Sequence, residues 1–93
     1  MGAAWFDELA DFLRIPSISA DPDRAQDVVA AARWVCARIR EAGGDCEILE
    51  RGGRPLVVGE IRASSRRNAP TILCYGHFDV QPPDPLELWE SPP

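Results

Sequence analysis

The stretch Thr71–Pro82, TILCYGHFDVQP, joins an apolar run to the only histidine of the chain. Its first part, Thr71–Tyr75, has almost no polar residue, which is typical of a strand buried on both faces at the centre of a sheet. The chain then opens at Gly76 and continues into His77 and, two residues later, Asp79. Because sites gather at the ends of strands in α/β sheets, this stretch predicts a functional site just after a central strand.

Two amphipathic helices are predicted upstream of this strand. The first ends before Pro16, and its large apolar residues recur with helical spacing, so we expect them to pack on a core. They are Trp5, Phe6, Leu9, Phe12 and Leu13. The second helix opens with Asp21 as N-cap and Pro22 at the first helical position, and it stops at Gly43-Gly44. Trp34 falls off its apolar stripe, so we expect that ring to be half exposed or to touch a residue outside the helix.

A β-hairpin is predicted between the second helix and the central strand. Residues 46–50 alternate loosely as an edge strand, residues 55–61 form its antiparallel partner, and Gly52-Gly53 lies in the turn. Two helices, a hairpin and a central buried strand indicate a layered α/β fold. No regular element is predicted after Pro82, and little remains to cover the second face of the sheet. We therefore expect residues 1–93 to be an incomplete part of a larger domain.

Composition narrows the class of protein. The chain has 93 residues and a net charge of −5, which argues against nucleic acid as a partner. No segment approaches the roughly 18 to 20 apolar residues of a membrane span, and the N-terminus does not have the pattern of a signal peptide. Three cysteines without tight spacing favour reduced thiols over a disulfide framework. We expect a cytoplasmic protein that binds neither nucleic acid nor membrane.

His77 and Asp79 are the candidate site residues. Residues two apart in an extended chain share a face, so Asp79 can hold the imidazole of His77 in one tautomer, as carboxylates do for zinc-ligating histidines. By the same rule Cys74 and His77 face opposite ways, and a thiol in a buried run is inert, which disfavours a Cys-His nucleophile. A lone histidine also fits a structural role. A non-catalytic α/β module therefore remains the alternative to a metal-dependent enzyme.

The residues around this histidine also carry a family resemblance. The segment Tyr75–Pro82, with Trp89 and Ser91-Pro92 after it, resembles the di-zinc metallopeptidase family of carnosinase, glutamate carboxypeptidase, acetylornithine deacetylase and aminoacylase. Its Asp-Val-Gln-Pro portion is most similar to the dipeptidase, carnosinase-like branch. Upstream, the segment Arg14–Ser19 and the long helix ending in Ala42-Gly43-Gly44 match the way these catalytic domains begin. The resemblance covers all 93 residues.

The resemblance implies the N-terminal portion of a three-layer αβα catalytic domain that hydrolyses the amide bond of dipeptides or N-acyl amino acids. His77 matches the first zinc ligand of the family, and Asp79 matches the active-site aspartate that orients it. A complete enzyme of the family holds two zinc ions through further acidic ligands and a distant histidine, uses a glutamate as general base, and can form a homodimer through a smaller lid domain. None of these can be matched to Asp84, Glu87 or Glu90. We therefore expect residues 1–93 to be inactive by themselves.

Overall fold

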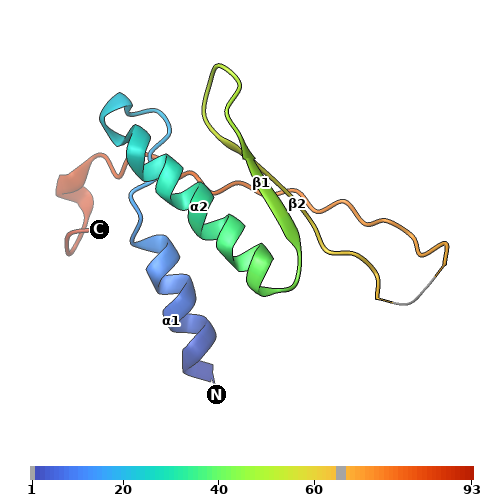
Figure 1. Ribbon diagram of the computed structural model, residues 1–93. Coiled ribbons are helices and arrows are strands. Elements are labelled where there is room, and N and C mark those ends of the chain that lie inside the picture. The colour runs from blue at the N-terminus through green and yellow to red at the C-terminus, as the bar shows by residue number, and fades with distance from the viewer. Residues whose placement is uncertain (1, 65–66) are drawn as a thin grey trace.

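The computed structural model describes residues 2–64 and 67–93. Its elements are α1 (Gly2–Leu13), the 3₁₀ turn η1 (Pro22–Arg24), α2 (Ala25–Glu41), β1 (Asp45–Leu49), β2 (Leu56–Glu60) and the 3₁₀ turn η2 (Leu86–Leu88). Figure 1 shows α2 lying across one face of the hairpin, while α1 extends away from it. Among the described residues, no helix is both long enough and apolar enough to cross a membrane. The predicted α/β class is confirmed, and η2 is a short element that was not predicted.

Helix α2 begins and ends close to the predicted positions. The side chain of Asp21 accepts a hydrogen bond of 2.9 Å from the backbone nitrogen of Asp23. Pro22 opens η1, which leads directly into the helix. At the other end Gly43 has a φ of +92°, a backbone conformation that glycine adopts without the steric cost of a Cβ atom. Asp21 therefore caps the 3₁₀ turn that leads into α2, whose own N-cap, Arg24, makes no side-chain capping hydrogen bond, and Gly43 ends the helix.

The core lies between α2 and the hairpin. The strands are antiparallel, as predicted, with Asp45 opposite Glu60 and Leu49 opposite Leu56. Both strands contact α2. Four apolar residues of the helix are buried, and half-buried residues of the strands complete this layer. The buried residues are Val28, Ala31, Ala32 and Cys36, and the half-buried strand residues are Cys46, Ile48, Leu49 and Val57.

Two glycines allow the helix and the hairpin to approach closely. A Cβ atom on Gly44 would lie 2.8 Å from the backbone oxygen of Glu60 and 2.8 Å from Cγ1 of Ile61. A Cβ atom on Gly59 would lie 2.8 Å from Cδ1 of Ile39. The obstacle at Gly44 includes backbone, which cannot move aside as the end of a side chain can. The turn between α2 and β1 therefore depends on the absence of a side chain at this position.

Replacing Gly44 with alanine is expected to lower the free energy of unfolding by about 1–3 kcal/mol, because the added methyl group overpacks the junction. Gly53→Ala is the matched control, since a Cβ atom there has nothing within 4 Å, and its effect should stay within about 0.5 kcal/mol. Urea unfolding followed by circular dichroism measures both variants. Equal midpoints for the two variants would contradict the close approach at Gly44.

Helix α1 packs on the rest of the chain through fewer residues than predicted. Trp5 is 62% exposed, Phe6 60% and Leu13 63%, so the expectation that the whole apolar face packs on a core is wrong. The contacts with α2 are made by Phe12, whose ring stacks on Trp34 at 4.6 Å between centroids, and by Glu8, which accepts a hydrogen bond of 2.6 Å from Arg38. The expectation that Trp34 touches a residue outside its own helix is thereby confirmed. The physical reason is that α1 extends away from α2 and the hairpin (Figure 1), so much of its apolar face has no neighbouring element among the described residues.

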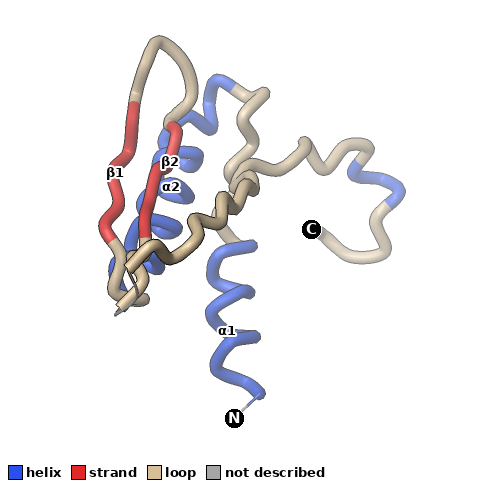
Figure 2. Tube along the Cα trace, turned by 90° about the vertical axis from the view of Figure 1, so that its right-hand side faces the viewer, coloured by secondary structure: helices blue, strands red, loops and turns tan. Residues whose placement is uncertain are grey.

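The predicted central strand is the largest difference from expectation. Residues 71–79 have no strand assignment, and Ile72, Leu73 and Tyr75 are 83%, 92% and 92% exposed. Figure 2 shows this segment as a loop that leaves the hairpin and runs toward the C-terminal turn. The prediction of a buried strand is wrong for this chain because the sheet has only β1 and β2 in the described residues, and an interior strand needs neighbours on both edges.

The molecule is less compact than a typical domain of its length. Its radius of gyration is 16.2 Å, against about 12 Å for a compact domain of this length. The outer face of the hairpin exposes Leu56 at 57% and Val58 at 46%. One helical layer on one face of a sheet is consistent with part of a three-layer αβα domain.

Candidate metal-ligand site

The loop after α1 pairs with the segment that carries the candidate site residues. The Ser17 hydroxyl donates a hydrogen bond of 2.7 Å to the Phe78 carbonyl oxygen. The Val80 backbone nitrogen donates one of 2.9 Å to the Ser17 carbonyl oxygen, and Ile18 forms a parallel bridge with Val80. Ser17 is 2% exposed. These contacts fix the backbone on both sides of Asp79.

The Asp79 carboxylate is held by a hydrogen bond to each of its oxygens. The Ser19 hydroxyl donates to Oδ2 at 2.6 Å, and His77 Nδ1 lies 2.9 Å from Oδ1. The hydrogen bond from Ser19, followed by that from His77, holds the pKa of the Asp79 carboxyl below its usual range. The carboxylate is therefore ionised at neutral pH and acts only as an acceptor.

The partners of His77 determine its tautomer. Nδ1 lies 2.9 Å from the Asp79 carboxylate and 3.1 Å from the Asp79 carbonyl oxygen. Both atoms are acceptors, so Nδ1 must carry the proton, and Nε2 of the neutral ring then carries the lone pair. The side chain is 75% exposed. This is the arrangement of a zinc-ligating histidine, in which a carboxylate accepts from one ring nitrogen and the other binds metal, so the chemistry of the pair fits one zinc ligand.

The hairpin turn also reaches this site. Arg54 Nε donates a hydrogen bond of 3.0 Å to the Ser19 carbonyl oxygen. Ser17, Ser19 and Arg54 were not among the residues predicted from the sequence. No local pattern indicates them, because Ser19 and Asp79 are 60 positions apart and Arg54 and Ser19 are 35 apart. The predicted nearness of His77 and Asp79 is what the structure shows, whereas their roles in metal binding and catalysis stay predictions.

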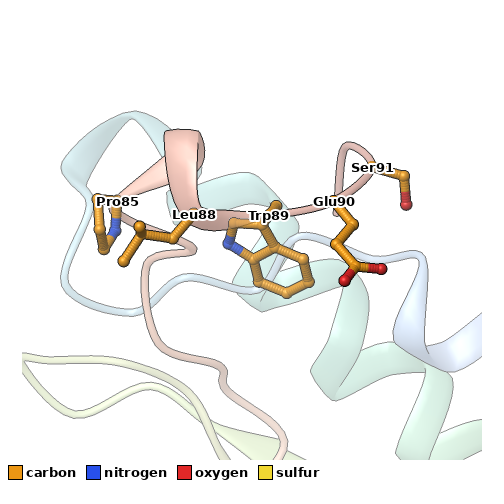
Figure 3. A pocket seen from close by; sticks show the side chains of 5 residues that line it. All are labelled: Pro85, Leu88, Trp89, Glu90 and Ser91. Atoms are coloured by element: carbon orange, nitrogen blue, oxygen red, sulfur yellow. The ribbon is translucent and has the colours of Figure 1, made fainter.

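Other acidic residues do not join His77 in a recognisable metal centre. Within residues 2–64 and 67–93, no three His, Cys, Asp or Glu side chains are grouped to hold an ion. A hollow of about 410 Å³ lies elsewhere, around η2 (Figure 3). It is lined by Pro85, Leu88, Trp89, Glu90 and Ser91. Neither His77 nor Asp79 lines this hollow, and all of its lining comes from one short segment. Within that segment, Trp89 Nε1 donates a hydrogen bond of 2.8 Å to the Pro83 carbonyl oxygen.

The three cysteines are free thiols in different surroundings. Cys36 is buried, Cys46 half-buried and Cys74 exposed. The expectation that Cys74 lies in a buried run is wrong, for the same reason as the missing central strand. Burial, followed by a hydrogen bond with Cys36, raises the pKa of the Cys46 thiol to about 11, so this thiol is protonated and unreactive at neutral pH.

Comparisons with known proteins identify homologous enzymes. The chain is 33% identical over 88 residues to the succinyl-diaminopimelate desuccinylase of Xylella fastidiosa (strain 9a5c). These 88 residues make up 95% of this chain and 21% of that protein. The enzymes of the same name from Stenotrophomonas maltophilia (strain R551-3) and Bordetella avium (strain 197N) are 32% and 31% identical over 91 residues, or 98% of this chain and 22% of each. No family model and no solved structure matches the chain.

The matches cover nearly all of this chain but a small part of each relative. The chain spans about a fifth of the length of the curated relatives it matches, at 21% and 22% of their residues. All three relatives are named as desuccinylases, which are hydrolases. The predicted dipeptidase branch is not among them and stays a prediction. Nearly all of this chain is thus similar to about a fifth of each of these desuccinylases.

Proposed function

We propose that this chain supplies a zinc ligand, His77, and its orienting carboxylate, Asp79, to a hydrolase that cleaves the amide bond of N-acyl amino acids. The supporting observation is the 2.9 Å contact between His77 Nδ1 and Asp79 Oδ1. It lies in a chain that matches a desuccinylase over 95% of its length. The name of that relative favours the N-acyl class, because a succinyl group on an amino nitrogen is an acyl group held by an amide bond.

The contribution of these residues is to present a ring nitrogen in the right protonation state. Asp79 retains the proton on Nδ1 of His77, which leaves the lone pair of Nε2 directed outward for a metal. Zinc ions, when bound, supply a water of lowered pKa and polarise the scissile carbonyl group. Because catalytic zinc sites use three protein ligands, one imidazole is insufficient. We propose that residues 1–93 are part of a larger cytoplasmic catalytic domain, do not turn over substrate alone, and join a homodimer only through additional polypeptide.

Dipeptides are the second candidate substrate class. The sequence Asp-Val-Gln-Pro at residues 79–82 supports this class through its resemblance to the carnosinase-like branch. Both classes present an amide bond next to a carboxylate-bearing residue, so the same zinc chemistry serves either. The choice between them depends on residues that contact the substrate on either side of that bond.

The test follows the single imidazole of the ¹⁵N-labelled chain during zinc titration. Zinc is expected to shift the Nε2 resonance of His77 strongly and Nδ1 much less, and His77→Gln should lose this binding. With zinc present, neither an N-succinyl amino acid nor a dipeptide should be hydrolysed faster by the chain than by His77→Gln. A shift confined to Nδ1, or tight binding of two ions by the chain alone, would overturn the proposal of one outward-facing ligand.

A further inference from the structure

We propose that Ser19 is a positioning residue of the candidate zinc site, whose hydroxyl holds the Asp79 carboxylate in the orientation that keeps the proton of His77 on Nδ1. The inference rests on the proposed function and deepens it by adding a residue from the loop after α1. Ser19 does not contact the metal position itself. It acts on His77 through Asp79.

The geometry of the carboxylate carries the first step. Ser19 Oγ lies 2.6 Å from Oδ2 of Asp79, and His77 Nδ1 lies 2.9 Å from Oδ1. Rotation of the carboxylate about its Cβ–Cγ bond would break both hydrogen bonds together. The side chain of Asp79 is 41% exposed, so water competes for its oxygens. The Ser19 hydroxyl therefore restricts a group that packing alone leaves free to turn.

Ser19 is itself anchored by two neighbouring elements. Arg54 of the hairpin turn donates to its carbonyl oxygen at 3.0 Å. The preceding residue, Ile18, forms the parallel bridge with Val80, one position after Asp79. The hydroxyl is thus placed from one side by the hairpin and from the other by the backbone of the candidate site. Because the backbone of Ser19 is already anchored, its short hydrogen bond restrains the orientation of the Asp79 carboxylate with little further loss of side-chain entropy at Ser19.

The Ser19 hydroxyl is one of several contacts that join the loop after α1 to the segment around Asp79. The two segments are already joined by the Ser17 hydroxyl on the Phe78 carbonyl oxygen at 2.7 Å, and by the Val80 backbone nitrogen on the Ser17 carbonyl oxygen at 2.9 Å. Removing the Ser19 hydroxyl leaves both of these contacts in place. Its loss should therefore change the state of the imidazole while the pairing of the two segments persists.

The test compares Ser19→Thr, which keeps the hydroxyl, with Ser19→Val, which has nearly the same shape without it. Long-range ¹H–¹⁵N spectra at a pH where His77 is neutral measure its tautomer ratio, and Val80 amide exchange reports the pairing of the segments. The Thr variant should retain the wild-type preference for the Nδ1–H form. In the Val variant the ratio of Nδ1–H to Nε2–H should fall by about 3- to 10-fold, the equilibrium equivalent of one hydrogen bond.

Three further variants make the result decisive. Ser19→Ala removes the same hydroxyl without a branched side chain and should reproduce the Val result. Arg54→Gln should lower the ratio less, while Arg51→Gln in the same turn should leave it unchanged. Equal tautomer ratios in the Thr, Val and Ala variants would overturn the inference. So would loss of Val80 protection in both variants that lack the hydroxyl, because the hydroxyl would then be a structural tie.

Zinc titration of the same samples separates this inference from the proposed function. If zinc leaves Nε2 of wild-type His77 unchanged while the difference between the Thr and Val variants persists, the zinc proposal fails and the positioning of the imidazole stands. If zinc shifts Nε2 but all variants share one tautomer ratio, the positioning inference fails and the zinc proposal stands.

Discussion

Replacing Asp79 with alanine is expected to weaken zinc binding at His77 by about 10- to 100-fold, the usual cost of losing the carboxylate behind a metal-ligating histidine. The variant removes the acceptor that lies 2.9 Å from Nδ1. The backbone carbonyl oxygen of residue 79, 3.1 Å from Nδ1, remains, but without the carboxylate the proton occupies Nε2 in part of the population, where the lone pair that the metal needs is then missing. Zinc titration monitored through the His77 resonances measures the loss.

Two variants control this prediction. Asp79→Asn keeps an acceptor oxygen but loses the negative charge, so its loss of affinity should be intermediate. Asp84→Ala removes an exposed carboxylate five positions away and should bind zinc as the wild type does. If Asp79→Ala also bound zinc as the wild type does, the pair would have no metal-directed role. The alternative of a non-catalytic α/β module with a structural histidine would then be favoured.

The exposed segment at residues 71–75 is expected to drive self-association of the isolated chain. Ile72, Leu73 and Tyr75 are each more than four-fifths exposed, at 83%, 92% and 92%. In the part of the chain that the structure describes, residues 71–79 make no backbone–backbone hydrogen bond. Apolar, β-prone residues with free backbone groups are a template for pairing with another copy. Wild-type chain should therefore form oligomers as its concentration rises.

The double variant Ile72→Lys with Leu73→Glu tests this and leaves the net charge of −5 unchanged. It should shift the chain strongly toward monomer in sedimentation velocity, without loss of helical circular dichroism. The matched control, Leu86→Lys with Leu88→Glu, changes residues that are 56% and 78% exposed outside this segment and should leave association nearly as in the wild type. Equal association in both double variants would show that residues 71–75 are not the contact.

The candidate site contains one contact that a local sequence pattern predicts and one that it does not. The pairing of His77 with Asp79 could be predicted because the two residues are only two positions apart, so local backbone geometry brings their side chains together even though no strand forms. Ser19 could not be predicted as a partner, because its contact with Asp79 closes a separation of 60 positions. A contact between residues so far apart in the sequence depends on the tertiary fold of the whole chain.

The helices and the hairpin were determined by the sequence itself. The apolar period, the Asp21-Pro22 start and the Gly43 stop define α2, and alternation around a glycine-containing turn defines the two strands. Each of these signals acts between residues that are close along the chain. Only the tertiary structure decided that Thr71–Tyr75 is unpaired and that Ser19 and Arg54 support Asp79. The physical reason is that burial and strand pairing are properties of neighbours in space, and an apolar run becomes a central strand only where other strands lie on both of its edges.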